Sequence, residues 1–448
     1  MSQSTGRSRL TKHETRRSLE SFNWSLSFRS VFVTVCAGTS FVFTAFALSL
    51  GLPKERMGFI TSLMSFACII QTVSLIATTR VKDRKGFILS AAIAEPVLVM
   101  VAVVLVPYLP AGLRLFALGA AVFMAAASLH LTQPLTDEWL ASTIPAEIRG
   151  RYLGRRFQIM SLVLIVTTLA VGAISEWIGK TNTVGLSKLL AAGGLFGVLS
   201  VLALRRATMP AVSATSRVEW RDIPRTFKGS AFRRYVLAVL IYSLPFLPSV
   251  PYYQVVNLEI LRMRESFIGY MMGGYYIVKI VAMPWVGRYV DRKGARHAML
   301  VFGPAYVLFF AGYALSTSGR VWPAVAAWAV AGVADAAYLV AMTGALYAAV
   351  PDDPARPAYF AVSNLFSLAT YGLGAVAAVP ILEALQGVHL TIGPVRLEQF
   401  QCFFALCTVL MVPCIFGALL LAQAEGDSSG RRRIACTARP GAEDRHAM

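Results

Sequence analysis

The tetrapeptide Asp-Arg-Lys-Gly stands at residues 83–86 and returns at residues 291–294, 208 positions later. Each copy follows one long apolar stretch and precedes another. A second pair of loops repeats in the same way, since Ile144-Pro145 and Val350-Pro351 are 206 positions apart. Two repeated motifs have nearly the same spacing, which is close to half of the 448-residue chain. This pattern indicates that the chain arose by duplication of a segment about half its length. Because the repeated loops join hydrophobic segments, the duplicated unit is predicted to be a set of membrane helices.

The composition agrees with a membrane protein. Hydrophobic residues make up 56% of the chain and charged residues only 15%, against about 25% charged residues in soluble domains. Twelve apolar stretches occur, each near the roughly 20 residues that a helix needs to cross a bilayer. We therefore predict an all-α membrane protein with twelve transmembrane helices in two six-helix halves. The stretches are 30–52, 57–79, 87–108, 113–138, 154–178, 184–204, 234–258, 266–287, 297–317, 321–348, 358–383 and 400–422.

Basic residues are distributed unevenly between the two sides of the predicted membrane. Of the 42 lysines and arginines, 32 lie in tails and loops on one side and nine on the other, while Lys279 lies inside a helix. The positive-inside rule puts the more basic side, with both termini, in the cytoplasm, and we expect a multi-pass protein of the inner (plasma) membrane. The net charge of +19 is then a topology signal, and no nucleic-acid partner is expected. The predicted segments are a cytoplasmic N-terminal tail (1–29), an N-terminal half (30–204), a cytoplasmic linker (205–233), a C-terminal half (234–424) and a cytoplasmic C-terminal tail (425–448).

Motifs of enzymatic chemistry are missing from the sequence. It has no P-loop, HExxH or GxSxG motif and no dinucleotide-binding fingerprint. Its six cysteines show no metal-ligand spacing. We therefore expect neither an enzyme nor a bound metal or cofactor, and no ATP hydrolysis by this chain.

The second copy of the repeated loop carries a family resemblance. Residues 287–296, Gly-Arg-Tyr-Val-Asp-Arg-Lys-Gly-Ala-Arg, resemble the cytoplasmic loop signature GxxxDRxGxR of the major facilitator superfamily. The first copy departs from that pattern at its first position, where Thr79 replaces glycine. The stretch 144–152 also looks like the loop between the fourth and fifth helices of bacterial members. The resemblance covers about residues 28–424 and implies a transporter that works by alternating access.

The two loop motifs are predicted to form a cytoplasmic gate. Their aspartates can accept hydrogen bonds from a helix N-terminus of the other half, where the helix dipole favours an anion. Their arginines can pair with carboxylates on neighbouring loops. Such contacts form when the cytoplasmic ends of the halves meet; the alternative is that the charges only fix topology. The gate residues are Asp83, Arg84, Gly86, Gly287, Asp291, Arg292 and Gly294.

Substrate contacts are expected among polar side chains at membrane depth, because such groups need a partner or a water-filled cavity. The resemblance implies that helices one, four, seven and ten border the central cavity. Each candidate is alternatively a residue that joins helices by a hydrogen bond. The candidates are His130, Gln133 and Asp137 on one face of the fourth helix, Tyr253 and Asn257 in the seventh, Asn364 in the eleventh and Gln71 in the second.

Two helices contain residues that are unusual in an apolar span. Pro245, Pro248 and Pro251 leave carbonyls unpaired and are predicted to kink or interrupt the seventh helix. Glu95 stands beside Pro96 in the third helix, which is usually peripheral, and we expect a structural or snorkelling role for it.

Lys279 and Asp335 form the sharpest prediction. Both lie about halfway along their helices, the eighth and the tenth, so they share a depth near the midplane. An unpaired charge there costs roughly 2.5–3.5 kcal/mol. The two are therefore predicted to pair, either permanently or as a pair that opens when Asp335 takes a proton or an anionic group displaces it, with Tyr276 lining the same place.

These features predict secondary active transport of a small polar, possibly anionic, organic solute across the lipid bilayer. Coupling to protons, as in a symport, is expected, and the chain is expected to work as a monomer. Two alternatives remain open at this stage. One is efflux of drugs or metabolites, and the other is a receptor or scaffold on the same fold that transports nothing.

Overall fold

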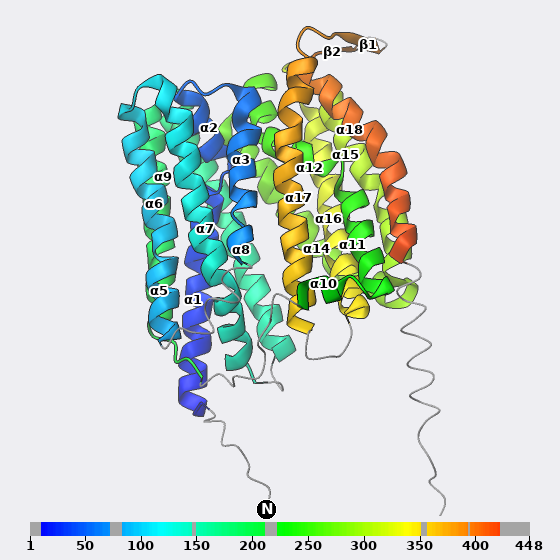
Figure 1. The fold of residues 1–448 in the computed structure, drawn as a ribbon. Coiled ribbons are helices and arrows are strands. Elements are labelled where there is room, and N and C mark those ends of the chain that lie inside the picture. Colours follow the sequence, from blue (N-terminus) through cyan, green and yellow to red (C-terminus); the bar gives the residue numbers. More distant parts are fainter. Residues whose placement is uncertain are drawn as a thin grey trace, which may run out of the picture.

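The computed structural model describes residues 10–71, 83–145, 149–210, 222–350, 356–392 and 395–421. The chain forms a bundle of long helices that run up and down side by side (Figure 1). Ten helices of the described part are long and apolar enough to cross a membrane, and one bent pair makes an eleventh span. The remaining predicted stretch, 57–79, is described as far as Gln71. The twelve-helix prediction thus agrees with this fold.

The N-terminal half begins earlier than predicted. Helix α1 starts at Lys12, inside the stretch taken as a tail, because Thr11 and Glu14 form a capping box. Arg29 therefore lies within a helix and not at the end of a tail. The elements of this half are α1 (Lys12–Cys36), α2 (Phe41–Ser49), a 3₁₀ turn (Lys54–Arg56), α3 (Met57–Phe66), α5 (Arg84–Ala92), α6 (Ala94–Leu105), a 3₁₀ turn (Val106–Tyr108), α7 (Ala111–Thr143), α8 (Arg149–Ile178) and α9 (Thr183–Leu204).

The C-terminal half contains the interrupted helix that its prolines predict. After α11, the chain passes through short α, 3₁₀ and π segments and bends by 47°. A small antiparallel β-hairpin also occurs in this half and was not predicted. The elements are α10 (Asp222–Thr226), α11 (Ser230–Ser243), α12 (Phe246–Ser249), a 3₁₀ turn (Val250–Tyr252), α13 (Tyr253–Val255), a π-helix (Val256–Ile260), α14 (Glu265–Phe302), α15 (Pro304–Ala314), α16 (Trp322–Ala349), α17 (Arg356–Ala384), β1 (Leu390–Ile392), β2 (Val395–Leu397), α18 (Gln399–Ile415) and a 3₁₀ segment (Phe416–Leu421).

The bundle has two ends, which we name by what lies there (Figure 1). The tail face is the end where α1 and α5 begin, and the hairpin face is the opposite end, where β1 and β2 lie. The halves are in contact toward the hairpin face. The Tyr252 hydroxyl donates to the Glu55 carbonyl at 2.6 Å, and Lys180 donates to the Leu258 carbonyl at 3.3 Å.

Helices α8 and α14 approach each other closely through two glycines. A Cβ on Gly172 would lie 2.9 Å from the Glu265 carbonyl oxygen and 3.1 Å from the Gly269 Cα. Both neighbours are main-chain atoms and cannot rotate away. The contact between the halves therefore requires glycine at this position.

Substitution of Gly172 by Val is expected to open the hairpin face. The added side chain forces α8 away from α14, so the buried surface between them gains access to water. A hydrophilic thiol reagent should then label a cysteine placed at Ser266 several-fold faster. The matched control is Gly274→Val on α14, where a Cβ meets no atom within 4 Å. Equal labelling rates in the two variants contradict this expectation.

Candidate functional site

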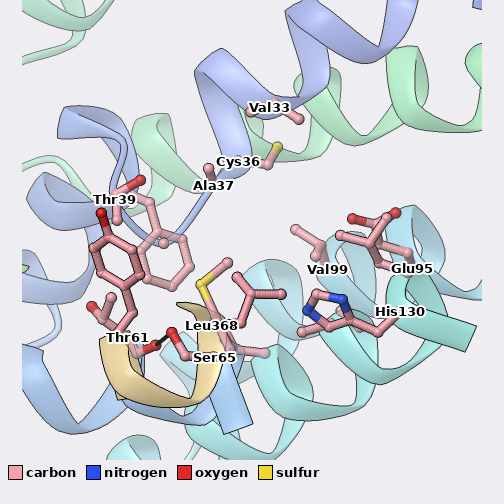
Figure 2. A pocket seen from close by; sticks show the side chains of 18 of the residues that line it. Val33, Cys36, Ala37, Thr39, Thr61, Ser65, Glu95, Val99, His130 and Leu368 are labelled. Carbon is pink, nitrogen blue, oxygen red and sulfur yellow. Dashed lines mark hydrogen bonds between the residues drawn. The ribbon is translucent and has the colours of Figure 1, made fainter. Parts of the chain in front are cut away.

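A cavity of about 430 Å³ lies between the two halves. Its wall combines residues of α1, α3, α6 and α7 with residues of α17 and of the interrupted helix. Most of the wall is apolar, with Phe32, Val99 and Leu368 among its members. Figure 2 shows polar side chains at separate places in the pocket, with Glu95 and His130 at one end and Thr61 and Ser65 away from them. A small organic molecule with an apolar body and polar groups fits such a wall.

An ion pair closes one end of the cavity. Arg29 of α1 donates to both carboxylate oxygens of Glu95 on α6, at 2.6 and 2.9 Å. The guanidinium also lies over the ring of Phe32, 5.6 Å from its centroid. Glu95 is only 7% exposed. Of the two roles expected for Glu95, snorkelling is wrong, because its carboxylate is turned inward to a fixed partner, and the structural role is confirmed, because the pair joins α1 to α6.

The three polar residues predicted on one face of the fourth helix, α7, do not all line the cavity. His130 is 7% exposed and lines the cavity beside Glu95. Gln133 lines the same cavity one turn further on. Asp137 lies one more turn toward the tail face, is exposed, and does not line the cavity. Two of the three candidates are thus brought to one place.

Two other predicted residues meet across the halves. Asn364 of α17 lines the cavity, and its amide donates to the side-chain oxygen of Gln71 at 2.8 Å. Tyr371 follows on the same helix and also lines the cavity. This hydrogen bond joins the two halves by neutral groups.

Lys279 and Asp335 pair within the C-terminal half. The Lys279 Nζ lies 3.3 Å from Asp335 Oδ2 and 3.2 Å from the Tyr275 hydroxyl. Tyr275 donates to the same carboxylate oxygen, and Tyr306 of α15 donates to the other. The side chains of Lys279 and Asp335 are 21% and 33% exposed. Both oxygens of the carboxylate are thus held by α14 and α15 together.

Tyr306 was not among the predicted residues, although its position in the sequence could have indicated it. It lies near the middle of the span 292–314, at the depth of Lys279 and Asp335. Tyr276, which was predicted to line this place, packs edge-on against Tyr275 with ring centroids 5.0 Å apart.

The structure places Tyr253 and Asn257 away from the cavity. The Tyr253 ring packs against Phe309 and Phe404, and its hydroxyl lies 2.7 Å from Ser249 Oγ. Asn257 is fully buried and accepts a hydrogen bond from Tyr313 at 3.1 Å. The interrupted backbone turns both side chains into the C-terminal half, where they join helices.

The loop motifs show how their glycines are used. Asp83 accepts a hydrogen bond from Gly86 N at 2.9 Å and so caps its own helix, α5. A Cβ at position 86 would overlap the Asp83 carboxylate. Gly294 has φ 83° and ψ 163°, a conformation available essentially to glycine alone, and it separates two spans inside α14.

The gate itself stays a prediction. Gly287 has no atom within 4 Å of an added Cβ, so it makes no close helix approach in this conformation. Arg292 is exposed, whereas Arg84 does interact with a neighbour. The side chain of Asp291, like Thr79, lies outside the described residues. The gate hypothesis predicts contacts of Asp83 and Asp291 with the other half only when the tail-face ends meet.

Comparisons with known proteins agree with these observations. Residues 235–435 match the sequence model of the Major Facilitator Superfamily. No curated protein sequence matches the chain. Within the described ranges, no cluster of three His, Cys, Asp or Glu side chains is arranged to hold a metal ion.

Several solved transporters have the same fold over nearly their whole length. A variant of the nucleoside transporter NupG has a TM-score of 0.71 and 12% identity, covering 90% of this chain and 99% of its own. A D-xylose-proton symporter has a TM-score of 0.63 and 16% identity, and the match covers 89% of this chain and 96% of the symporter chain. A bacterial homologue of the human lysosomal transporter Spinster, inward-facing and unoccupied, has a TM-score of 0.62 and 14% identity. The match covers 97% of this chain and 100% of the homologue. These structural neighbours are transporters and not enzymes.

Proposed function

Since residues 235–435 match the model of the Major Facilitator Superfamily and the chain has the fold of solved transporters along its length, we propose that it is a secondary active transporter of that superfamily. It moves a small polar organic solute by alternating access and couples that movement to protons. The observation that carries the proposal is the cavity of about 430 Å³ between the halves, to which both halves contribute polar groups. A molecule held there contacts both of the bodies that must move.

The charges at membrane depth favour a neutral solute. Arg29 is engaged by Glu95, and Lys279 is engaged by Asp335. Neither cation is available to an anionic group unless its carboxylate first leaves or takes a proton. A neutral molecule with hydroxyl or amide groups instead matches Asn364, Gln133 and Tyr371. An anionic solute is the second choice.

Proton coupling is assigned to Asp335. A proton on this carboxylate removes the charge that holds Lys279, and the tyrosines that donate to it must then reorient. Because α14, α15 and α16 all contribute to this contact, its rearrangement changes the packing of the C-terminal half. Such a change is what a coupled transporter needs to link protonation to reorientation.

The two alternative functions, drug efflux and a receptor or scaffold, predict a different cavity between the halves. A drug-efflux pump with broad apolar selectivity has no need of a hydrogen bond such as Asn364 to Gln71 beside its cavity. A receptor or scaffold has no need of a cavity between the halves.

We place the protein in the inner membrane with both termini cytoplasmic, as a monomer with both the solute and protons as its partners.

Uptake into proteoliposomes tests the proposed function. Radiolabelled uridine and D-xylose serve as neutral, hydroxylated probes. An inward proton gradient is expected to drive accumulation of at least one of them above the external concentration, and a protonophore should abolish it. Protein-free liposomes are the control. Uptake that equals the control, or that is unchanged by the protonophore, contradicts proton-coupled transport of such solutes.

A further inference from the structure

A second cavity, of about 400 Å³, lies near the hairpin face, on the outside of the bundle. Both halves form its wall, α3 and α7 from the first and α17 from the second. Phe59 and Val376 in this wall are 45% and 41% exposed, so the cavity is a groove that opens away from the bundle. We name it the seam groove, and its lining residues are Arg56, Phe59, Leu115, Val376, Val379 and Pro380.

The inner side of the seam groove is closed by a contact between α3 and α17, which are neighbours in the bundle (Figure 1). A Cβ on Gly58 would lie 2.5 Å from the Ala375 carbonyl oxygen. These two residues directly precede the lining residues Phe59 and Val376. Ala375 also belongs to the wall of the cavity between the halves. The packed backbones therefore lie between the two cavities, and the seam groove is a separate site.

The seam groove lies near the hairpin-face ends of three helices. Arg56 comes directly before α3, which begins at Met57. Leu115 is in the first two turns of α7, and Val376 is in the last three turns of α17. At 1.5 Å per residue, the apolar part of the groove is within roughly 12 Å of the helix ends. In a bilayer, this is the depth of the upper acyl chains, where no water is available to fill an apolar groove. A lipid chain is then the material that fills it.

Arg56 supplies a charge at the outer end of the seam groove. It is exposed, and its guanidinium forms no ion pair with any carboxylate of the described residues. Glu383, one turn after Val379 on α17, is also exposed and does not pair with it. The turn Lys54–Arg56 carries two cations and one anion, so its net charge is positive. A guanidinium can donate two parallel hydrogen bonds to a phosphate group.

We propose that the seam groove is a binding site for one anionic phospholipid. Its phosphate accepts hydrogen bonds from Arg56, and one acyl chain packs against Phe59, Leu115 and Val376. A headgroup with net negative charge is preferred to a zwitterionic one, because the ammonium of the latter is repelled by the positive turn. Since the wall comes from both halves, the bound lipid contacts both of them. This site does not depend on which solute is carried, or on transport itself.

Photocrosslinking locates the lipid. The full-length protein is placed in nanodiscs of phosphatidylcholine that contain a small fraction of phosphatidylglycerol with a diazirine in its acyl chain. After irradiation, mass spectrometry of peptides is expected to find the label on α3 and α17 at the seam groove. Unlabelled phosphatidylglycerol should displace the probe, whereas added phosphatidylcholine or inorganic phosphate should not. Diazirine-labelled phosphatidylcholine should label the groove several-fold less.

Three variants separate the charge from the shape of the groove. Arg56→Gln is expected to lower labelling by phosphatidylglycerol about ten-fold, the effect of losing a hydrogen bond to a charged group. Arg320→Gln is the matched control, because it removes an exposed cation between α15 and α16 that does not line the groove, and labelling should not change. Val376→Trp fills the groove and should lower labelling by both lipids.

Four outcomes overturn the proposal. These are a label that is absent from the groove, equal labelling by the two lipids, equal labelling in Arg56→Gln and Arg320→Gln, and displacement of the probe by inorganic phosphate. Equal labelling by the two lipids means that only bulk lipid fills the groove, and displacement by phosphate means a site for a free anion. If Arg56→Gln does not fold, Val376→Trp and the competition between lipids still decide.

Discussion

Accumulation driven by a proton gradient is expected to fall at least ten-fold in both Lys279→Gln and Asp335→Asn. Each substitution leaves one member of the pair without its partner, and an unpaired charge at this depth costs roughly 2.5–3.5 kcal/mol. Asp335→Asn also removes the carboxylate to which we assign the coupling proton, so the solute is expected still to exchange across the membrane but not to be concentrated. Accumulation and counterflow exchange in proteoliposomes measure the two activities separately.

Two further variants control this prediction. The double variant Lys279→Gln/Asp335→Asn has no unpaired charge, so it should recover stability without recovering accumulation. Arg16→Gln breaks an exposed pair with Glu20, whose side chains are 83% and 59% exposed, and should change nothing, because such pairs contribute little. Normal accumulation in both single variants rejects the coupling role.

Loss of the Arg29–Glu95 pair is expected to lower the free energy of unfolding by about 3–5 kcal/mol. Glu95→Leu leaves a guanidinium buried beside an apolar wall, and Arg29→Met leaves a carboxylate there. Removal of one partner is more costly than removal of both, because the remaining charge stays desolvated. Denaturation in detergent, followed by tryptophan fluorescence, measures the change.

The double variant Arg29→Met/Glu95→Leu is the matched control and should regain most of the lost stability. Arg29→Lys tests the geometry, since an ammonium cannot donate two parallel hydrogen bonds to one carboxylate. An effect of less than about 1 kcal/mol in both single variants, the range of exposed pairs, contradicts a buried pair.

The sequence predicted the helical spans well because their signals are local. The length of the apolar stretches and the duplicated loops predicted the helix bundle. The three prolines predicted the interrupted helix. Contacts at the site were harder to predict. Arg29 follows a polar stretch that resembles a tail, and its partner Glu95 is 66 positions away. Pairing at such separation depends on how helices pack, which no local pattern encodes.

The orientation of single side chains was also beyond the sequence. No proline or glycine marks the break at Ala67 and Cys68, so the interruption of the second helix could not be predicted from the sequence. Conversely, Tyr253 and Asn257 follow a proline-rich stretch that suggested exposure to a cavity. In the structure, Tyr253 in α13 and Asn257 in the π-helix lie in the packed interior instead. Lys279 and Asp335 were paired correctly because depth alone, counted along two helices, brings them together.

The two ion pairs described at membrane depth each lie wholly inside one half, Arg29 with Glu95 in the first and Lys279 with Asp335 in the second. In the alternating access that we propose, these charges travel with their own half and need not separate in hydrocarbon. In the described part of the chain, the bonds between the halves include a neutral one, Asn364 with Gln71, and an exposed ion pair, Arg264 with Glu176, where the arginine side chain is 81% exposed. Lys180 also donates to the Leu258 carbonyl. Neutral hydrogen bonds are worth about 0.5–1.5 kcal/mol each. We therefore expect reorientation of the halves to exchange these contacts and to leave both ion pairs intact.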